Sequence, residues 1–128
     1  MIMRIALWSS LLALSAMAGE KVHVSIPAAE FQAKMAEETG TLLDVRSPKE
    51  HAEGHVAGCK LINYFDEDFK EQLTRLPKEG TYYIYCRSGG RSGKTLKLMK
   101  ELGFPRVYDM AGGMTGWQSA GLPVAKNP

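Results

Sequence analysis

The sequence has little of several features that would place a protein in a special class. It contains two cysteines, so at most one internal disulfide can form and a disulfide-stapled scaffold is excluded. Its formal charge of +2 gives no electrostatic basis for binding nucleic acid. Internal repeats, low-complexity tracts and Gly/Ser linkers are absent. The 128 residues suffice for one domain with a hydrophobic core and are too few for two ordinary domains.

Long apolar runs are also missing. The longest, residues 5–14, falls short of the roughly 20 residues that a helix needs to span a bilayer. Arg4 precedes this run and the small-x-small sequence Ala16-Met17-Ala18 follows it, an order typical of a secretory signal peptide. An uncleaved membrane anchor is the alternative. We expect residues 1–18 to be a signal peptide, residues 19–128 to form one domain, and the mature protein to be periplasmic or secreted.

The remaining chain alternates short β-rich apolar runs with helix-like stretches, which predicts an α/β fold with parallel strands and crossover helices. The predicted strands lie near residues 22–25, 41–45, 60–63, 81–85 and 106–109. Helical spacing of apolar side chains predicts helices over residues 27–38, 65–76 and 92–102. The face of the second helix that is expected in the core carries Phe65, Phe69, Leu73 and Leu76.

The most informative segment is a β-rich run that ends at Cys86 and is followed by a glycine-containing turn and a helix. Ligands bind at the carboxyl ends of strands in open α/β sheets. Gly89 and Gly90 tolerate positive φ, so the turn can direct backbone N–H groups inward as an anion-binding nest. The helix N-terminus and two arginines, Arg87 and Arg91, predict a lowered pKa for Cys86. A buried cysteine that only caps a strand would not need these neighbours.

Three segments resemble signatures of the rhodanese-like domain family, and they cover almost the whole chain after residue 18. The first is residues 43–46 (LDVR), then Glu50 and residues 54–58 (GHVAG). The second, residues 86–92 (CRSGGRS), is similar to the active loop of single-domain sulfurtransferases. The third is residues 110–117 (MAGGMTGW), then residues 120–124 (AGLPV). Their order makes the resemblance far more specific than any one segment.

This resemblance implies a central, mostly parallel five-stranded sheet with helices on both faces and a loop from Cys86 to Arg91 around the active sulfur. It implies an enzyme, a thiosulfate sulfurtransferase, whose Cys86 thiolate takes sulfur from thiosulfate or a similar small anion as a persulfide. Cyanide, a thiol or an acceptor protein then receives the sulfur. No metal or organic cofactor is required, and neither nucleic acid nor a membrane is expected as a partner.

We therefore expect Cys86 to be the nucleophile. The residues expected to bind the substrate are Arg87, Ser88, Gly89, Gly90, Arg91 and Ser92. Their N–H groups would stabilise the thiolate and the persulfide. Either arginine can present paired donors to the donor anion. Ser92 is a hydroxyl donor or, as we prefer, the N-cap of the following helix.

Residues outside the loop allow structural and functional interpretations. Asp44, Arg46 and Glu50 are interpreted as a buried ion-pair group rather than as catalytic groups. His51 and His55 have the i, i+4 spacing of metal ligands, but no third ligand is evident, so zinc is not expected. His55 is expected to brace its loop through hydrogen bonds.

Cys59 departs from the family pattern, in which a small residue usually follows this glycine. We interpret it as a small buried residue. The alternative is a resolving thiol that forms a disulfide with Cys86. The residues after Pro123 are expected to be a short free tail.

Two other functions could use a loop of this kind. A cysteine-dependent phosphatase uses a similar loop with five residues between cysteine and arginine, whereas four separate Cys86 from Arg91. The smaller ring favours sulfur over a phosphoryl group. A non-catalytic sulfur-delivery module would use the same loop, although inactive members of the family commonly lose the cysteine that is intact here.

Overall fold

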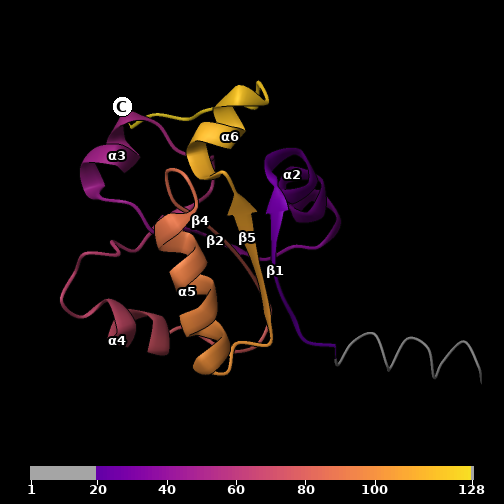
Figure 1. Ribbon diagram of the computed structural model, residues 1–128. Helices are drawn as coiled ribbons and strands as arrows, with labels where there is room; N and C mark the ends of the chain where they lie inside the picture. Colours follow the sequence, from indigo (N-terminus) through magenta and orange to yellow (C-terminus); the bar gives the residue numbers. More distant parts are fainter. Residues whose placement is uncertain (1–19, 128) are drawn as a thin grey trace, which may run out of the picture.

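The computed structural model describes residues 20–127, which form a central β-sheet with helices on both faces (Figure 1). The strands are β1 (Val22–Pro27), β2 (Thr41–Asp44), β3 (Lys60–Leu61), β4 (Thr81–Tyr85) and β5 (Arg106–Ala111). They lie in the order β1-β5-β4-β2-β3, and every pair is parallel. The predicted α/β class is confirmed, and the sheet is parallel throughout rather than mostly parallel. The predicted signal peptide lies outside the described residues.

Five helices connect or follow these strands. They are α2 (Ala28–Glu37), α3 (Pro48–Glu53), α4 (Phe69–Thr74), α5 (Gly90–Glu101) and α6 (Gly113–Ser119). Buried side chains of α4 and α5 pack on one face of the sheet, and those of α2 and α6 pack on the other. Within residues 20–127, no helix is long and apolar enough to cross a membrane.

Strand β4 lies at the centre of the sheet and is buried along its whole length. Because successive side chains of a strand point to opposite faces, Tyr82 and Ile84 enter the α4/α5 core, while Tyr83 and Tyr85 enter the α2/α6 core. Cys86 continues this alternation and lies with the α4/α5 core. The three tyrosines of β4 are therefore core residues that pack on both faces of the sheet.

The family-like segments meet at one edge of the sheet. Since β2, β4 and β5 are parallel, the residues that follow them emerge at the same carboxyl edge. There α3 follows β2, the loop to α5 follows β4, and α6 follows β5 (Figure 1). Three segments far apart in the sequence therefore surround Cys86.

Two helices and one helix boundary differ from the predictions. Helix α3 buries no residue, so it has no apolar stripe; the reciprocal capping box of Ser47 and Glu50 starts it instead. Helix α6 follows Gly112, whose φ is 79°. Helix α4 begins at Phe69 rather than near Phe65, which is 67% exposed. The Asn63 side chain accepts the Phe65 N–H at 3.0 Å and holds this segment in a turn.

The prediction of a free tail after Pro123 is wrong. His55 and Ala125 exchange two backbone hydrogen bonds, each of 2.8 Å, in an isolated antiparallel bridge. The Trp117 indole N–H donates to the Pro123 carbonyl at 2.8 Å. These contacts fasten the segment to α6 and to the loop between α3 and β3.

Leu73 and Phe65, which the sequence places on one helix face, differ in exposure and should therefore differ in their contribution to stability. Leu73 is fully buried, so Leu73→Ala should lower the free energy of unfolding by about 2–4 kcal/mol, the cost of a cavity in a core. Phe65→Ala should change it by less than about 0.5 kcal/mol. Urea unfolding of both variants measures this difference, and equal losses would contradict the described helix boundary.

Candidate active site

The Cys86 sulfur lies in a cup of hydrogen-bond donors at the carboxyl end of β4. The thiol is 1% exposed. The Gly89 N–H donates to Sγ at 3.1 Å, and the Ser92 hydroxyl donates to it at 3.3 Å. Gly89 adopts a left-handed φ of 111° and α5 begins at the next residue, Gly90, so the loop closes around the sulfur within four residues.

This cup shifts the acidity of the thiol. Burial raises the pKa of Cys86, but hydrogen bonds from the Ser92 hydroxyl and from the N–H groups of Ser92, Gly89 and Ser88 outweigh burial and lower it overall. The direction of this shift agrees with the prediction that the pKa of Cys86 is lowered. Three of the expected loop residues therefore direct donors at the sulfur, because the turn points their N–H groups inward.

The N-cap assignment of Ser92 is wrong. The helix begins earlier than expected, with Gly89 as N-cap, and Ser92 lies inside the first turn of α5. Its side chain is fully buried. The hydroxyl donates to the Cys86 sulfur, which is the alternative that the sequence left open.

Helix α6 holds the loop from behind. The N–H groups of Met114 and Thr115 donate to the carbonyls of Cys86 and Arg87 at 2.8 and 3.0 Å. A side chain at Gly113, whose φ is 54°, would collide with these same carbonyls. In the sequence, residues 110–117 were only part of the third family-like segment. In the structure, Gly113 of this segment allows α6 to approach the backbone of the active loop.

The two loop arginines have different surroundings. Arg91 makes a two-point ion pair with Glu50, with N–O distances of 2.8 and 2.9 Å. This pairing lowers the pKa of Glu50 to about 2. Arg87 is exposed, and no ion pair of it occurs within residues 20–127. The guanidinium left available beside the loop is that of Arg87.

The ion-pair group after β2 contains two of the three expected residues. Asp44 and Arg46 are buried and meet at 2.8 and 2.9 Å. Burial raises the pKa of Asp44, but hydrogen bonds from Arg46 lower it overall. Arg46 also donates to the Gly54 carbonyl at 2.6 Å and so ties β2 to the next loop. Glu50 does not join this pair, because it turns toward Arg91.

A pocket of about 240 Å³ opens beside the loop. Its walls come from the loop, α6 and the α3 region: Arg46, Glu50, Glu53, Gly54, Arg87, Met114, Thr115 and Gln118. Arg46 and Glu50 are engaged in the ion pairs described above, so Arg87 supplies the cation available to a ligand.

Comparisons with known proteins agree with this arrangement. Residues 27–120 match the family described as Rhodanese-like domain. The chain belongs to this family. Thiosulfate sulfurtransferase 16, chloroplastic, of Arabidopsis thaliana is 34% identical over 92 residues, which are 64% of this chain and 77% of that protein. Thiosulfate sulfurtransferase GlpE of Actinobacillus pleuropneumoniae is 31% identical over 87 residues, 68% of this chain and 79% of that protein.

A solved structure shows the same fold. A rhodanese-related protein of Thermoplasma volcanium superposes with a TM-score of 0.71 at 29% identity, over 80% of this chain and 98% of that one. The relatives named as sulfurtransferases place this rhodanese-like domain in a family of sulfur-transferring enzymes.

The two cysteines of this rhodanese-like domain lie on opposite faces of the sheet. Both are free thiols. Cys86 belongs to the α4/α5 core, whereas Cys59 packs against the α2/α6 core with its sulfur 3.6 Å from the Tyr85 hydroxyl. A direct disulfide would require one side chain to cross the sheet, so the arrangement favours the small half-buried residue over the resolving thiol.

One buried carboxyl near the loop had no role in the sequence analysis. Asp109 on β5 is 2% exposed and accepts a hydrogen bond from the Ser25 hydroxyl at 2.7 Å. Its other oxygen has no partner within the described residues. Burial raises the pKa of Asp109, and the hydrogen bond from the Ser25 hydroxyl only partly offsets this effect. Its signal in the sequence is a carboxylate between Tyr108 and Met110, in the interior of a β-rich run.

The Ser92 hydroxyl should control how the Cys86 thiol ionises. In a Cys59→Ala background, Ser92→Ala removes a donor to the thiolate, so the pKa of Cys86 rises and its alkylation midpoint moves to higher pH. At pH values below the midpoint, where the thiolate is the minor form, we expect alkylation by iodoacetamide to slow about tenfold, the worth of one hydrogen bond to a charged group. Ser88→Ala keeps the backbone donor and should titrate like the parent. Identical profiles for all three proteins would contradict this role.

Proposed function

We propose that this chain transfers sulfane sulfur from thiosulfate or a similar anion to cyanide or a thiol, with Cys86 carrying the sulfur as a persulfide. The observation that supports it most is the cup of donors around the Cys86 sulfur. Ser92 and Gly89 lie 3.3 and 3.1 Å from Sγ, and such donors stabilise a thiolate and, after sulfur uptake, a persulfide anion.

Sulfur transfer through Cys86 proceeds in two nucleophilic steps. The Cys86 thiolate attacks the outer sulfur of thiosulfate and forms a new S–S bond. The original S–S bond breaks, and its electron pair leaves with sulfite. Cyanide or a thiolate then attacks the outer sulfur of the persulfide, and Cys86 returns as thiolate. No proton, metal or redox cofactor is needed in either step with anionic acceptors.

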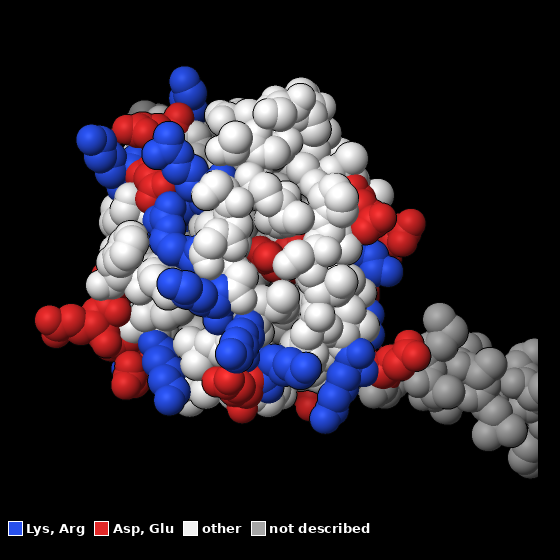
Figure 2. All heavy atoms as spheres, viewed as in Figure 1, with Lys and Arg blue, Asp and Glu red and all other residues white. Residues whose placement is uncertain are grey.

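We assign the binding of the donor anion to Arg87. Arg91 is committed to Glu50, whereas Arg87 is exposed at the wall of the pocket. A guanidinium offers paired donors that match two oxygens of a sulfonate-like group. Basic side chains form a band across the face that Figure 2 shows. Such a band favours the approach of an anion.

The same geometry argues against a phosphatase. A phosphate-binding loop needs room for three phosphoryl oxygens and an arginine that faces them. Here the Ser92 and Gly89 donors approach the sulfur itself within 3.3 Å, and the arginine at the end of the loop is paired with Glu50. The loop has four residues between Cys86 and Arg91, one fewer than the phosphatase signature, and the smaller ring favours one added sulfur atom over a phosphoryl group.

We also propose that the protein is exported, on the basis of residues 1–18 alone. Sequencing the N-terminus of the protein recovered from a periplasmic or secreted fraction tests this: a first residue of Gly19 supports cleavage after Ala18, and Met1 contradicts it.

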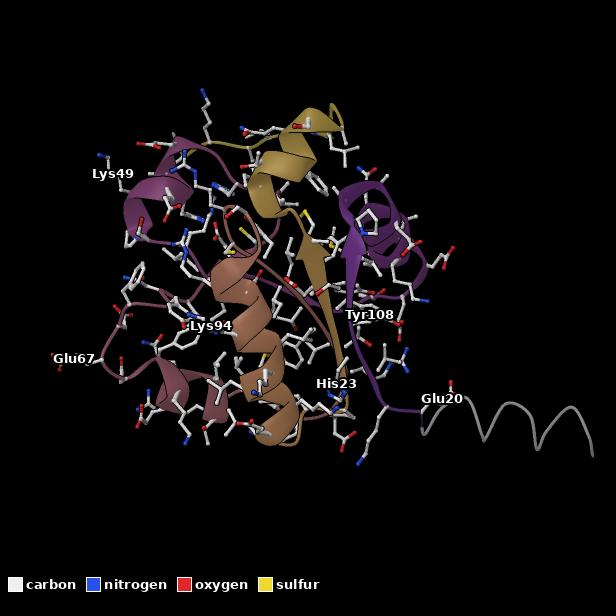
Figure 3. The ribbon with its side chains drawn as sticks, viewed as in Figure 1. Glu20, His23, Lys49, Glu67, Lys94 and Tyr108 are labelled. Atoms are coloured by element: carbon white, nitrogen blue, oxygen red, sulfur yellow. The ribbon has the colours of Figure 1, made fainter. Side chains whose placement is uncertain are left out.

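Arg87 should determine the KM for thiosulfate. At about 0.15 M salt, where exposed charges are screened, Arg87→Ala should raise this KM roughly tenfold in a thiosulfate-to-cyanide assay. The KM for cyanide should change little, and Arg87→Lys should recover part of the loss. Lys94→Ala removes an exposed cation of α5 (Figure 3) and serves as the control. An unchanged KM in Arg87→Ala would contradict the assignment.

A further inference from the structure

A second group of reactive side chains lies apart from the Cys86 cup, on α3 and the loop that follows it. Its members are His51, His55 and Cys59, and each is partly exposed. One ring nitrogen of each histidine and the Cys59 sulfur all lie within 4.8 Å of one another. The mechanism proposed for Cys86 uses none of the three.

The fold supplies the third ligand that the sequence did not reveal. After His55 the chain turns back through Gly58, whose φ is 83°, and the Cys59 N–H donates to the Val56 carbonyl at 3.3 Å. This turn returns the Cys59 sulfur to 3.9 Å from Nδ1 of His51. An i, i+4 histidine pair thus gains a sulfur ligand four residues farther on.

Hydrogen bonds prepare both imidazoles for a cation. Nδ1 of His51 lies 3.0 Å from the Asp44 carboxylate, and Nδ1 of His55 lies 2.8 Å from the His51 carbonyl. Both partners are acceptors, so each Nδ1 carries the proton and each Nε2 keeps its lone pair. A carboxylate or carbonyl behind the imidazole is the arrangement found around metal-ligating histidines.

We propose that His51, His55 and Cys59 form a binding site for zinc or a similar borderline-soft divalent cation. Imidazole and thiolate together suit such an ion, and three protein ligands leave a fourth position to solvent. Binding replaces the Cys59 thiol proton, which is released to solvent. The divalent ion and the Cys59 thiolate together add one net positive charge near the buried Asp44 carboxylate, which also pairs with Arg46.

Binding requires the side chains to rearrange, because the His51 nitrogen that lies 3.9 Å from the Cys59 sulfur is Nδ1, which faces Asp44, whereas the ligand would be Nε2. The two imidazole rings are now stacked, with centroids 3.9 Å apart and planes 6° apart. A tetrahedral zinc ion holds its nitrogen and sulfur ligands roughly 3.3 to 3.6 Å from one another. The His55 ring must therefore turn out of the stack, and the partial exposure of all three residues leaves space for this rotation.

The test uses the full chain with Cys86→Ser, so that the other thiolate cannot bind the ion and the result does not depend on sulfur transfer. Calorimetric titration with Zn²⁺ should give one ion per chain. Titration with Co²⁺ should give a sulfur-to-metal charge-transfer band and the visible bands of a tetrahedral ion. A second substitution, Cys59→Ser, should remove the charge-transfer band and weaken zinc binding at least tenfold.

His55→Gln provides a second variant and should also weaken zinc binding at least tenfold. The matched control is His23→Gln, since His23 lies on β1 (Figure 3) with its ring against the Phe104 carbonyl and away from the cluster. Circular dichroism confirms that each variant is folded. Absence of stoichiometric binding, or binding that survives both Cys59→Ser and His55→Gln, would overturn the proposal.

Discussion

The backbone hydrogen bonds from α6 to the active loop are the contacts on which the rest of the site depends. Met114 and Thr115 engage the carbonyls of Cys86 and Arg87. Since the C=O and N–H of a peptide group point in opposite directions, this engagement sets the direction in which the loop backbone faces. The donors that surround Cys86 can then converge on its sulfur. Gly113 is required because any side chain there would occupy the contact.

The charged side chains around the loop are of two kinds: those held in ion pairs within the protein, and Arg87, which is exposed to a ligand. Glu50 fixes Arg91, and Asp44 fixes Arg46, so both pairs link α3 and its surroundings to the sheet or to the loop. Arg87 keeps an exposed guanidinium beside the pocket. Behind the sulfur, Ser92 lies near the buried Asp109, whose pKa is raised by burial. A buried thiolate is thus stabilised by fixed dipoles rather than by a directly paired cation.

Much of this arrangement was accessible from the sequence. Alternating β-rich and helical runs predicted the α/β class, and apolar periodicity located all five strands, although β3 is shorter than expected. The cysteine, the two glycines and the two arginines that follow β4 predicted the active loop, residues 86–91. The family-like segments predicted which parts of the chain contribute to the site, because parallel strands deliver their following residues to one edge.

The remaining features depend on tertiary contacts that no local pattern records. Helix α3 has a capping box but no apolar stripe, and the partner of Glu50 lies 41 residues away. The sequence favours Ser92 as the N-cap of α5, but the helix begins two residues earlier, at Gly90, because Gly89 adopts a left-handed conformation. Cys59 joins the histidine pair through a turn, and Ala125 finds His55 across 70 residues of sequence.

The central claim is that Cys86 carries sulfur covalently. Intact mass of the protein after treatment with thiosulfate tests it directly, with Cys86→Ser and Cys59→Ser as matched variants. The account predicts a mass increase of one sulfur atom that cyanide removes, that persists in Cys59→Ser and that disappears in Cys86→Ser. An unchanged mass, or an added sulfur that remains when Cys86 is replaced, would contradict it.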